Sequence, residues 1–67
     1  MTTWHLLLGC PGALRSTVDG VLVWVTPSRL GGWSYHWMPE DSAMESGYAP
    51  TLEAAQTMAE AAARGEL

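Results

Sequence analysis

Three side chains of this sequence can bind soft metal ions or act as nucleophile and base, and they are His5, Cys10 and His36. Zinc sites place Cys or His ligands in close pairs, and the spacing of these three residues matches no such pattern. Cys10, His36 and Asp41 also supply the residue types of a nucleophile, a base and an orienting carboxylate. The sequence has no strained nucleophile turn, however, and a chain of 67 residues leaves little volume for a substrate pocket. We therefore expect no metal site, no cofactor and no enzymatic activity.

Three acidic residues lie close together in the sequence at Glu40, Asp41 and Glu45. Carboxylates bind Ca²⁺ when they recur at the spacing of a calcium loop, and these do not. The segment 39–46 is polar and rich in turn-forming residues, which predicts an exposed loop. Gly31-Gly32 carries no phosphate-binding motif and indicates a tight entry into the strand that follows.

The charge balance argues against a nucleic-acid partner. The formal net charge is −4, and only 15% of the residues are charged. Arg15, Arg29 and Arg64 are widely spaced in the sequence, whereas proteins that bind a phosphate backbone present clustered Lys and Arg. A nucleic-acid-binding regulator is therefore the third function class to consider, and it requires salt-sensitive binding to DNA or RNA.

Length and cysteine content limit how the fold is stabilised. The 67 residues predict a single domain over residues 1–67, in which one core rarely supplies more than about 3–5 kcal/mol. Cys10 is the single cysteine, so no disulfide can form within the chain, and an unpaired thiol is typical of a reducing compartment. Stabilisation must then come from dense packing of the four tryptophans or from self-association.

The sequence predicts no membrane contact. No segment approaches the roughly 18 apolar residues of a membrane span. The first eight residues have no basic flank and too short an apolar run for a signal peptide. The expected location is the cytoplasm.

Hydrophobic patterns predict the strands. Residues 21–26 form a nearly continuous apolar run, which is typical of a central strand buried on both faces. In the run from Trp33 to Trp37 large aromatic residues alternate with small or polar ones, which is the period of a strand with one apolar face. Asp19-Gly20 favours a two-residue hairpin turn. Strands are expected near residues 4–8, 21–26 and 33–38, with a further strand over 14–18 and a brief return to the sheet edge at 47–50 left open.

Signals at both ends predict a helix over residues 52–64. Thr51 is a suitable N-cap, and Gly65 suits the position after the last turn. The inward stripe, which recurs at helical spacing, consists of Leu52, Ala55, Met58, Ala59 and Ala62. Because most of these residues are small, we expect the helix to lie close to a sheet that supplies the bulky side chains. The predicted fold is α+β, a three- or four-stranded antiparallel sheet with one C-terminal helix packed on one face.

The C-terminal third resembles a recurrent pattern in small bacterial and phage proteins. Gly47-Tyr48-Ala49 is followed by Thr51-Leu52-Glu53-Ala54-Ala55 and an alanine-rich helix. The segment is similar to HicB-type antitoxins and to short uncharacterised proteins of actinobacteria and their phages. There a Thr-Leu-Glu-x-Ala helix folds back over an antiparallel sheet. The resemblance implies the same fold and an antitoxin-like regulatory role, and it assigns no functional residues.

A surplus of apolar strand residues indicates a binding surface, because one helix covers only one face of the sheet and monomers rarely expose large apolar patches without a use. The expected function is non-catalytic protein binding, by a phage or mobile-element accessory protein that binds and inhibits a host factor. The alternative is a homodimer. The expected binding residues are aromatic with an acidic rim: Trp24, Trp33, Tyr35, Trp37, Glu40 and Asp41.

The same aromatic residues also suit the core of a very small domain. Which of the two roles they have depends on the face of the sheet that the helix covers. If Trp33, Tyr35 and Trp37 lie under the helix, the expected contact surface shifts to Leu22 and Trp24.

Overall fold

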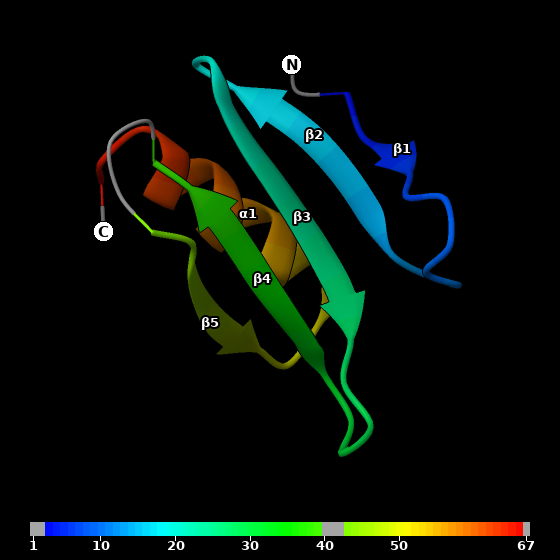
Figure 1. Ribbon diagram of the computed structural model, residues 1–67. Helices are drawn as coiled ribbons and strands as arrows, with labels where there is room; N and C mark the ends of the chain where they lie inside the picture. The colour runs from blue at the N-terminus through cyan, green and yellow to red at the C-terminus, as the bar shows by residue number, and fades with distance from the viewer. Residues whose placement is uncertain (1–2, 40–42, 67) are drawn as a thin grey trace.

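The chain folds as a five-stranded antiparallel sheet followed by one helix that packs against one face of the sheet. Figure 1 shows the computed structural model, which describes residues 3–39 and 43–66. The strands lie side by side in chain order. The elements are β1 His5–Leu6, β2 Leu14–Val18, β3 Val21–Pro27, β4 Trp33–Met38, β5 Glu45–Ala49 and α1 Leu52–Ala63. The predicted α+β class and the C-terminal helix are confirmed, but the sheet has five strands rather than three or four.

The additional strand is β5, which begins inside the segment that its polar composition assigns to a loop. Glu45 lies opposite Trp37, and Ser46 lies opposite His36. β5 is an edge strand with a single neighbour, β4. An edge strand needs only one paired side and commonly carries polar or charged residues. Polar composition alone therefore does not exclude a strand at this position.

The first strand is shorter than its apolar run predicts. β1 comprises only two residues, although the bulky run extends over residues 4–8. The chain turns directly after it: the Leu7 N–H donates to the Ala13 carbonyl at 3.0 Å, and the Cys10 N–H donates back to the Leu7 carbonyl at 3.3 Å. The turn thus starts before the apolar run ends.

The hairpin between β2 and β3 has the turn that Asp19-Gly20 favours. Asp19 has a φ of 51° and Gly20 a φ of 79°. Both central residues of a type I′ turn require positive φ, and this turn matches the right-handed twist of the flanking strands. The turn sets the register of β2 against β3 and places residues 14–18 in the sheet.

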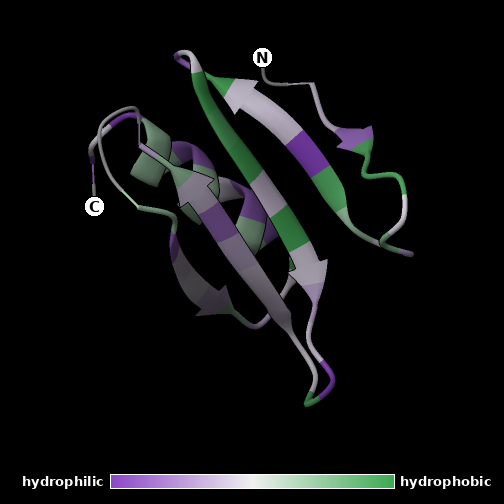
Figure 2. Cartoon of the chain, viewed as in Figure 1, coloured by the Kyte–Doolittle hydropathy of each residue, from purple (hydrophilic) through white to green (hydrophobic). Residues whose placement is uncertain are grey.

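The core lies between α1 and the face of the sheet that the helix covers. β3, the central and most hydrophobic strand in Figure 2, buries Val23 and Val25 completely, and β4 adds Tyr35. The helix contributes Ala55 and Ala59, which have no exposed surface. Because alanine is small, the helix backbone can lie close to the sheet while the valines and the tyrosine fill the space.

Both ends of α1 satisfy their free backbone groups. The Thr51 hydroxyl accepts a hydrogen bond from the Ala54 N–H at 3.1 Å, as an N-cap does. After the last turn, Gly65 has a φ of 78°, and the N–H groups of Gly65 and Glu66 donate to the carbonyls of Ala62 and Ala61. This is a Schellman motif, which ends a helix where a glycine adopts the left-handed conformation.

A glycine on β5 makes room for the tyrosine of the core. Gly47 lies directly opposite Tyr35 in the register of β4 and β5. A Cβ atom at Gly47 would lie 2.3 Å from the Tyr35 ring. Real Cβ atoms do not approach other atoms that closely, so the ring can lie over the backbone of β5 only if residue 47 has no side chain.

We predict that Gly47→Ala lowers the free energy of unfolding by about 1–3 kcal/mol, because the methyl group displaces the Tyr35 ring from the core. Urea denaturation followed by circular dichroism measures the change. Ser46→Ala is the matched control, since Ser46 is exposed on the same strand and should change stability by less than about 0.5 kcal/mol. Equal stabilities for the wild type and Gly47→Ala would contradict the close packing of the tyrosine.

Candidate functional site

Three of the aromatic residues expected at the binding surface lie under the helix. Trp33, Tyr35 and Trp37 point to the covered face of β4: Tyr35 is a core residue, and the two tryptophans pack against the core. The rings of Tyr35 and Trp37 are stacked, with centroids 5.7 Å apart. These three side chains therefore build the interior rather than an exposed patch, so the expected contact surface shifts to Leu22 and Trp24. Glu40 and Asp41, expected at the rim, lie outside the described residues.

The opposite face of the sheet carries no covering element among the described residues, and the view in Figure 1 looks onto it, with α1 behind. Side chains alternate along each strand, so the neighbours of the core residues point to this side. We call this surface the open face. Its residues on β2 to β5 are Arg15, Thr17, Leu22, Trp24, Thr26, Ser34, His36, Met38, Ser46 and Tyr48.

The open face exposes three large apolar or aromatic side chains on three neighbouring strands. Leu22 is 41% exposed and lies directly opposite Met38, which is 46% exposed. Tyr48 is 58% exposed, and its hydroxyl donates a hydrogen bond to the Gly31 carbonyl at 2.9 Å. That bond holds the phenol ring against the hairpin between β3 and β4. The apolar surface is therefore supported by regular strands and by a fixed ring.

A stacked pair lies at the centre of the open face. Trp24 and His36 are opposite each other on β3 and β4, with ring centroids 5.3 Å apart and an angle of 19° between the ring planes. Both residues are half-buried. Stacking of this kind restrains both rings, so the pair forms a flat aromatic area at the centre of the open face.

The imidazole of His36 has few polar partners. Its Nε2 lies 3.4 Å from the Thr26 hydroxyl, and its Nδ1 is buried with no hydrogen-bond partner among the described residues. Burial lowers the pKa of the His36 imidazole below its ordinary value of 6.5, because the charged form loses solvation. The open face is therefore neutral at its centre near pH 7.

His36 is the open-face residue that could act as a base. The hydroxyl within reach of its ring is that of Thr26 at 3.4 Å, and among the described residues no third group orients the imidazole. Cys10 is exposed in the connection between β1 and β2, far along the chain from β4. Within residues 3–39 and 43–66, no group of three or more His, Cys, Asp or Glu side chains is arranged to hold a metal ion. The open face presents mainly apolar, aromatic and hydroxyl side chains.

Met38, His36 and Tyr48 lie on the open face but were not among the binding residues expected from the sequence. A signal for them exists in the sequence, since each is one position away from a residue that packs inward, namely Trp37, Tyr35 and Ala49. Using this signal requires knowing which set of alternating residues the helix covers.

The described part of the chain contains no helix long and apolar enough to cross a membrane.

We predict that stability falls as the pH is lowered from about 7.5 to about 5, and that His36→Gln reduces this fall. The folded-state pKa of His36 is lowered, so below pH 6.5 the unfolded chain takes up a proton that the folded chain resists. Protonation therefore favours unfolding, and the stabilising effect of the neutral ring is complete only above that pH. Urea denaturation at several pH values measures the slope. An unchanged slope in His36→Gln would contradict the prediction.

Comparison of the chain with protein-family models, with curated proteins and with solved structures found no match. The similarity of the C-terminal segment to HicB-type antitoxins and to small phage proteins thus stays a prediction. A sheet covered by one helix hosts many unrelated functions, so the function has to be argued from the surface itself.

Proposed function

We propose that this chain is a non-catalytic protein-binding module and that the open face is its contact surface. The observation that carries the proposal is the exposure of Leu22, Met38 and Tyr48 around the stacked pair of Trp24 and His36. Tyrosine, tryptophan and methionine are enriched at the centres of protein interfaces, where they supply large contact areas. Polar hydroxyl groups surround them, as at the rim of an interface.

The dimensions of the open face favour a modest interface. β2 to β5 contain 5, 7, 6 and 5 residues, and at about 3.3 Å per residue and about 4.8 Å between strands they present roughly 350–400 Å². A standard interface buries about 800 Å² on each partner. The open face alone thus supplies somewhat less than half of a standard interface. We infer a transient complex, or one in which the partner also contacts the neighbouring loops.

The partner that fits this surface is a protein with an apolar patch. Arg15, at the β2 side, is the single Asp, Glu, Lys or Arg residue among the ten residues of the open face, so long-range charge attraction contributes little to recognition. We propose an accessory protein of a phage or mobile element that binds and inhibits a host factor. The support for this biological setting is the resemblance of the C-terminal segment to small phage proteins.

The test is capture of a partner from a lysate of the organism that encodes the chain, with the double variant Leu22→Ser, Met38→Ser. We predict that the wild type retains a defined partner and that the double variant loses it, because two apolar contacts beside the stacked pair become polar. The matched control is Leu8→Ser, Leu30→Ser, which removes two leucines that are 93% and 97% exposed on loops outside the open face.

The control variant should retain the partner. Loss of the partner in the control but not in the open-face variant would move the contact surface to the loops and overturn the proposal. Thermal unfolding of both variants establishes that each is folded. Purified partner and chain should then bind directly, with the same order of affinities among the variants.

Self-association is the second candidate function, and the neutral character of the open face favours it. A two-fold dimer brings the same patch of both copies together, so a patch with few charges avoids repulsion between like charges. We predict that, if the open face forms a homodimer, sedimentation velocity at micromolar concentration shows a mass that rises with concentration in the wild type and stays monomeric in Leu22→Ser, Met38→Ser. A concentration-independent monomer excludes this candidate and leaves binding to another protein.

A further inference from the structure

The basic residues of this acidic chain gather at one edge of the sheet. Arg15 and Arg64 are two of the three arginines, and together with His5 they line one cavity of about 460 Å³. The third arginine, Arg29, lies in the hairpin between β3 and β4, outside this cavity. Such a concentration is unexpected in a chain with a net charge of −4.

The cavity occupies the place where β1 stops and β2 continues. β1 pairs with β2 only at two positions, His5 with Arg15 and Leu6 with Leu14, whereas β2 extends to Val18. The outer edge of β2 beyond Arg15 is therefore not covered by β1. A notch at a sheet edge is accessible from both faces, which explains how Arg15 from the sheet and Arg64 from the helix end line the same space.

The main chain of Thr17 faces this notch. In an antiparallel pair, successive residues direct their N–H and C=O groups alternately to opposite sides of the strand. Val18 and Val21 flank the two-residue turn, so Val18 is directed toward β3 and Thr17 toward the outer edge. Among the described residues, no backbone hydrogen bond joins Thr17 to Thr3 across that edge. Within the described part of the chain, the Thr17 N–H is thus a donor that a ligand could engage.

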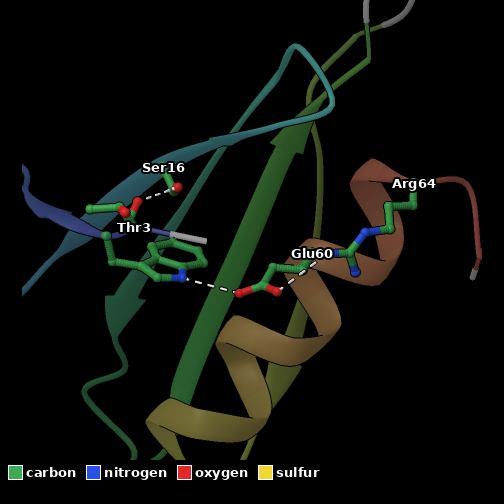
Figure 3. A network of polar contacts seen from close by, with 5 residues as sticks. Thr3, Ser16, Glu60 and Arg64 are labelled. Carbon is green, nitrogen blue, oxygen red and sulfur yellow. Dashed lines mark hydrogen bonds and ion pairs between the residues drawn. The ribbon is translucent and has the colours of Figure 1, made fainter. Parts of the chain in front are cut away.

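Polar contacts fix the walls of the notch. The Ser16 hydroxyl is buried and donates a hydrogen bond to the Thr3 carbonyl at 2.5 Å, which holds the N-terminal segment beside β2. Figure 3 shows Glu60 of the helix between two partners: its carboxylate accepts a hydrogen bond from the Trp4 indole at 3.2 Å and lies 3.6 Å from the Arg64 guanidinium. The segment before β1 and the helix are thereby tied to each other.

Arg64 keeps donors for a ligand in spite of its acidic neighbour. Its distance of 3.6 Å from Glu60 is longer than a hydrogen bond, and the side chain remains 40% exposed. A guanidinium carries five N–H donors, of which this contact can engage only a part. Asp19 is the one carboxylate among the described residues of the cavity wall, so the wall has a positive net charge.

We propose that this notch binds one compact oxyanion, such as the phosphate or carboxylate group of a small molecule. A guanidinium matches the planar, two-oxygen geometry of such groups, and Arg15, Arg64 and Thr17 line the same notch. The Thr17 N–H adds a backbone donor on its wall. The volume falls within the range of small-molecule sites. With only two arginines, the notch suits one anionic group and not the length of a nucleic-acid backbone. The site shares Arg15 and Thr17 with the β2 edge of the open face, but its donors are distinct from the exposed apolar residues on which the proposed contact surface rests.

The test is a titration of the isotope-labelled chain, without any protein partner, with sodium phosphate, sodium acetate or sodium chloride at matched ionic strength. Two-dimensional amide NMR follows the Thr17 N–H directly. We predict a saturable shift of the Thr17 signal with phosphate, with acetate or with both, and none with chloride. The anion whose titration saturates identifies the phosphate or the carboxylate as the preferred group. Shifts that do not saturate, or that chloride reproduces, overturn the proposal.

Substitutions separate a defined site from general charge attraction. Arg15→Gln and Arg64→Gln should each weaken binding about threefold to tenfold, the effect of losing a charged hydrogen bond in a partly solvated site. Arg29→Gln removes the same charge from the distant hairpin and should leave the affinity unchanged. Arg15→Lys and Arg64→Lys keep the charge and should lose less than the glutamine variants. Equal losses in Arg29→Gln and in Arg15→Gln overturn the site, and the unaltered amide spectrum of each variant establishes that it is folded.

Discussion

The contact of two alanines with the sheet determines the rest of this structure. Ala55 and Ala59 have no exposed surface and bring the helix backbone close to β3 and β4. A longer side chain at either position would lift the helix and open a gap around Val23 and Val25. This approach requires the bulk of the core to come from the strands, which is why Tyr35 and its neighbouring tryptophans lie inward. Among the described residues, no element covers the other face of the sheet.

The elements of this fold could largely be predicted from the sequence, whereas the face of the sheet to which each side chain points could not. Caps and small residues define the helix, and Asp19-Gly20 defines the first hairpin, because these signals are local. No local signal sets which side chains of β3 and β4 face the helix, because β3 is apolar on both faces. Leu22 and Trp24 point away from the helix. The start of β5 could not be predicted from composition, because Glu45 and Ser46 are polar and only their pairing with β4 makes them part of a strand.

The residues of the candidate surface could be predicted only in part, for the same reason. Most of the binding residues expected from the sequence are aromatic, and a very small core needs aromatic bulk as well. Trp24 lies on the open face as expected, but its stacked partner is a histidine, and the apolar residues beside it are Leu22 and Met38. The basic notch was beyond prediction, because Arg15 and Arg64 are distant in sequence and come together only through the short β1 and the end of the helix.

The hydrogen bond between Trp4 and Glu60 has a consequence for the order in which the chain folds. A sheet whose strands pair in chain order is built mostly from contacts between residues near each other in sequence, and such topologies fold rapidly. The Trp4–Glu60 bond instead joins residues that are 56 positions apart. Closing so long a loop costs more conformational entropy than forming any hairpin of the sheet. We therefore expect the attachment of the N-terminal segment to the helix to form late, after the sheet and the helix have brought its two ends close together.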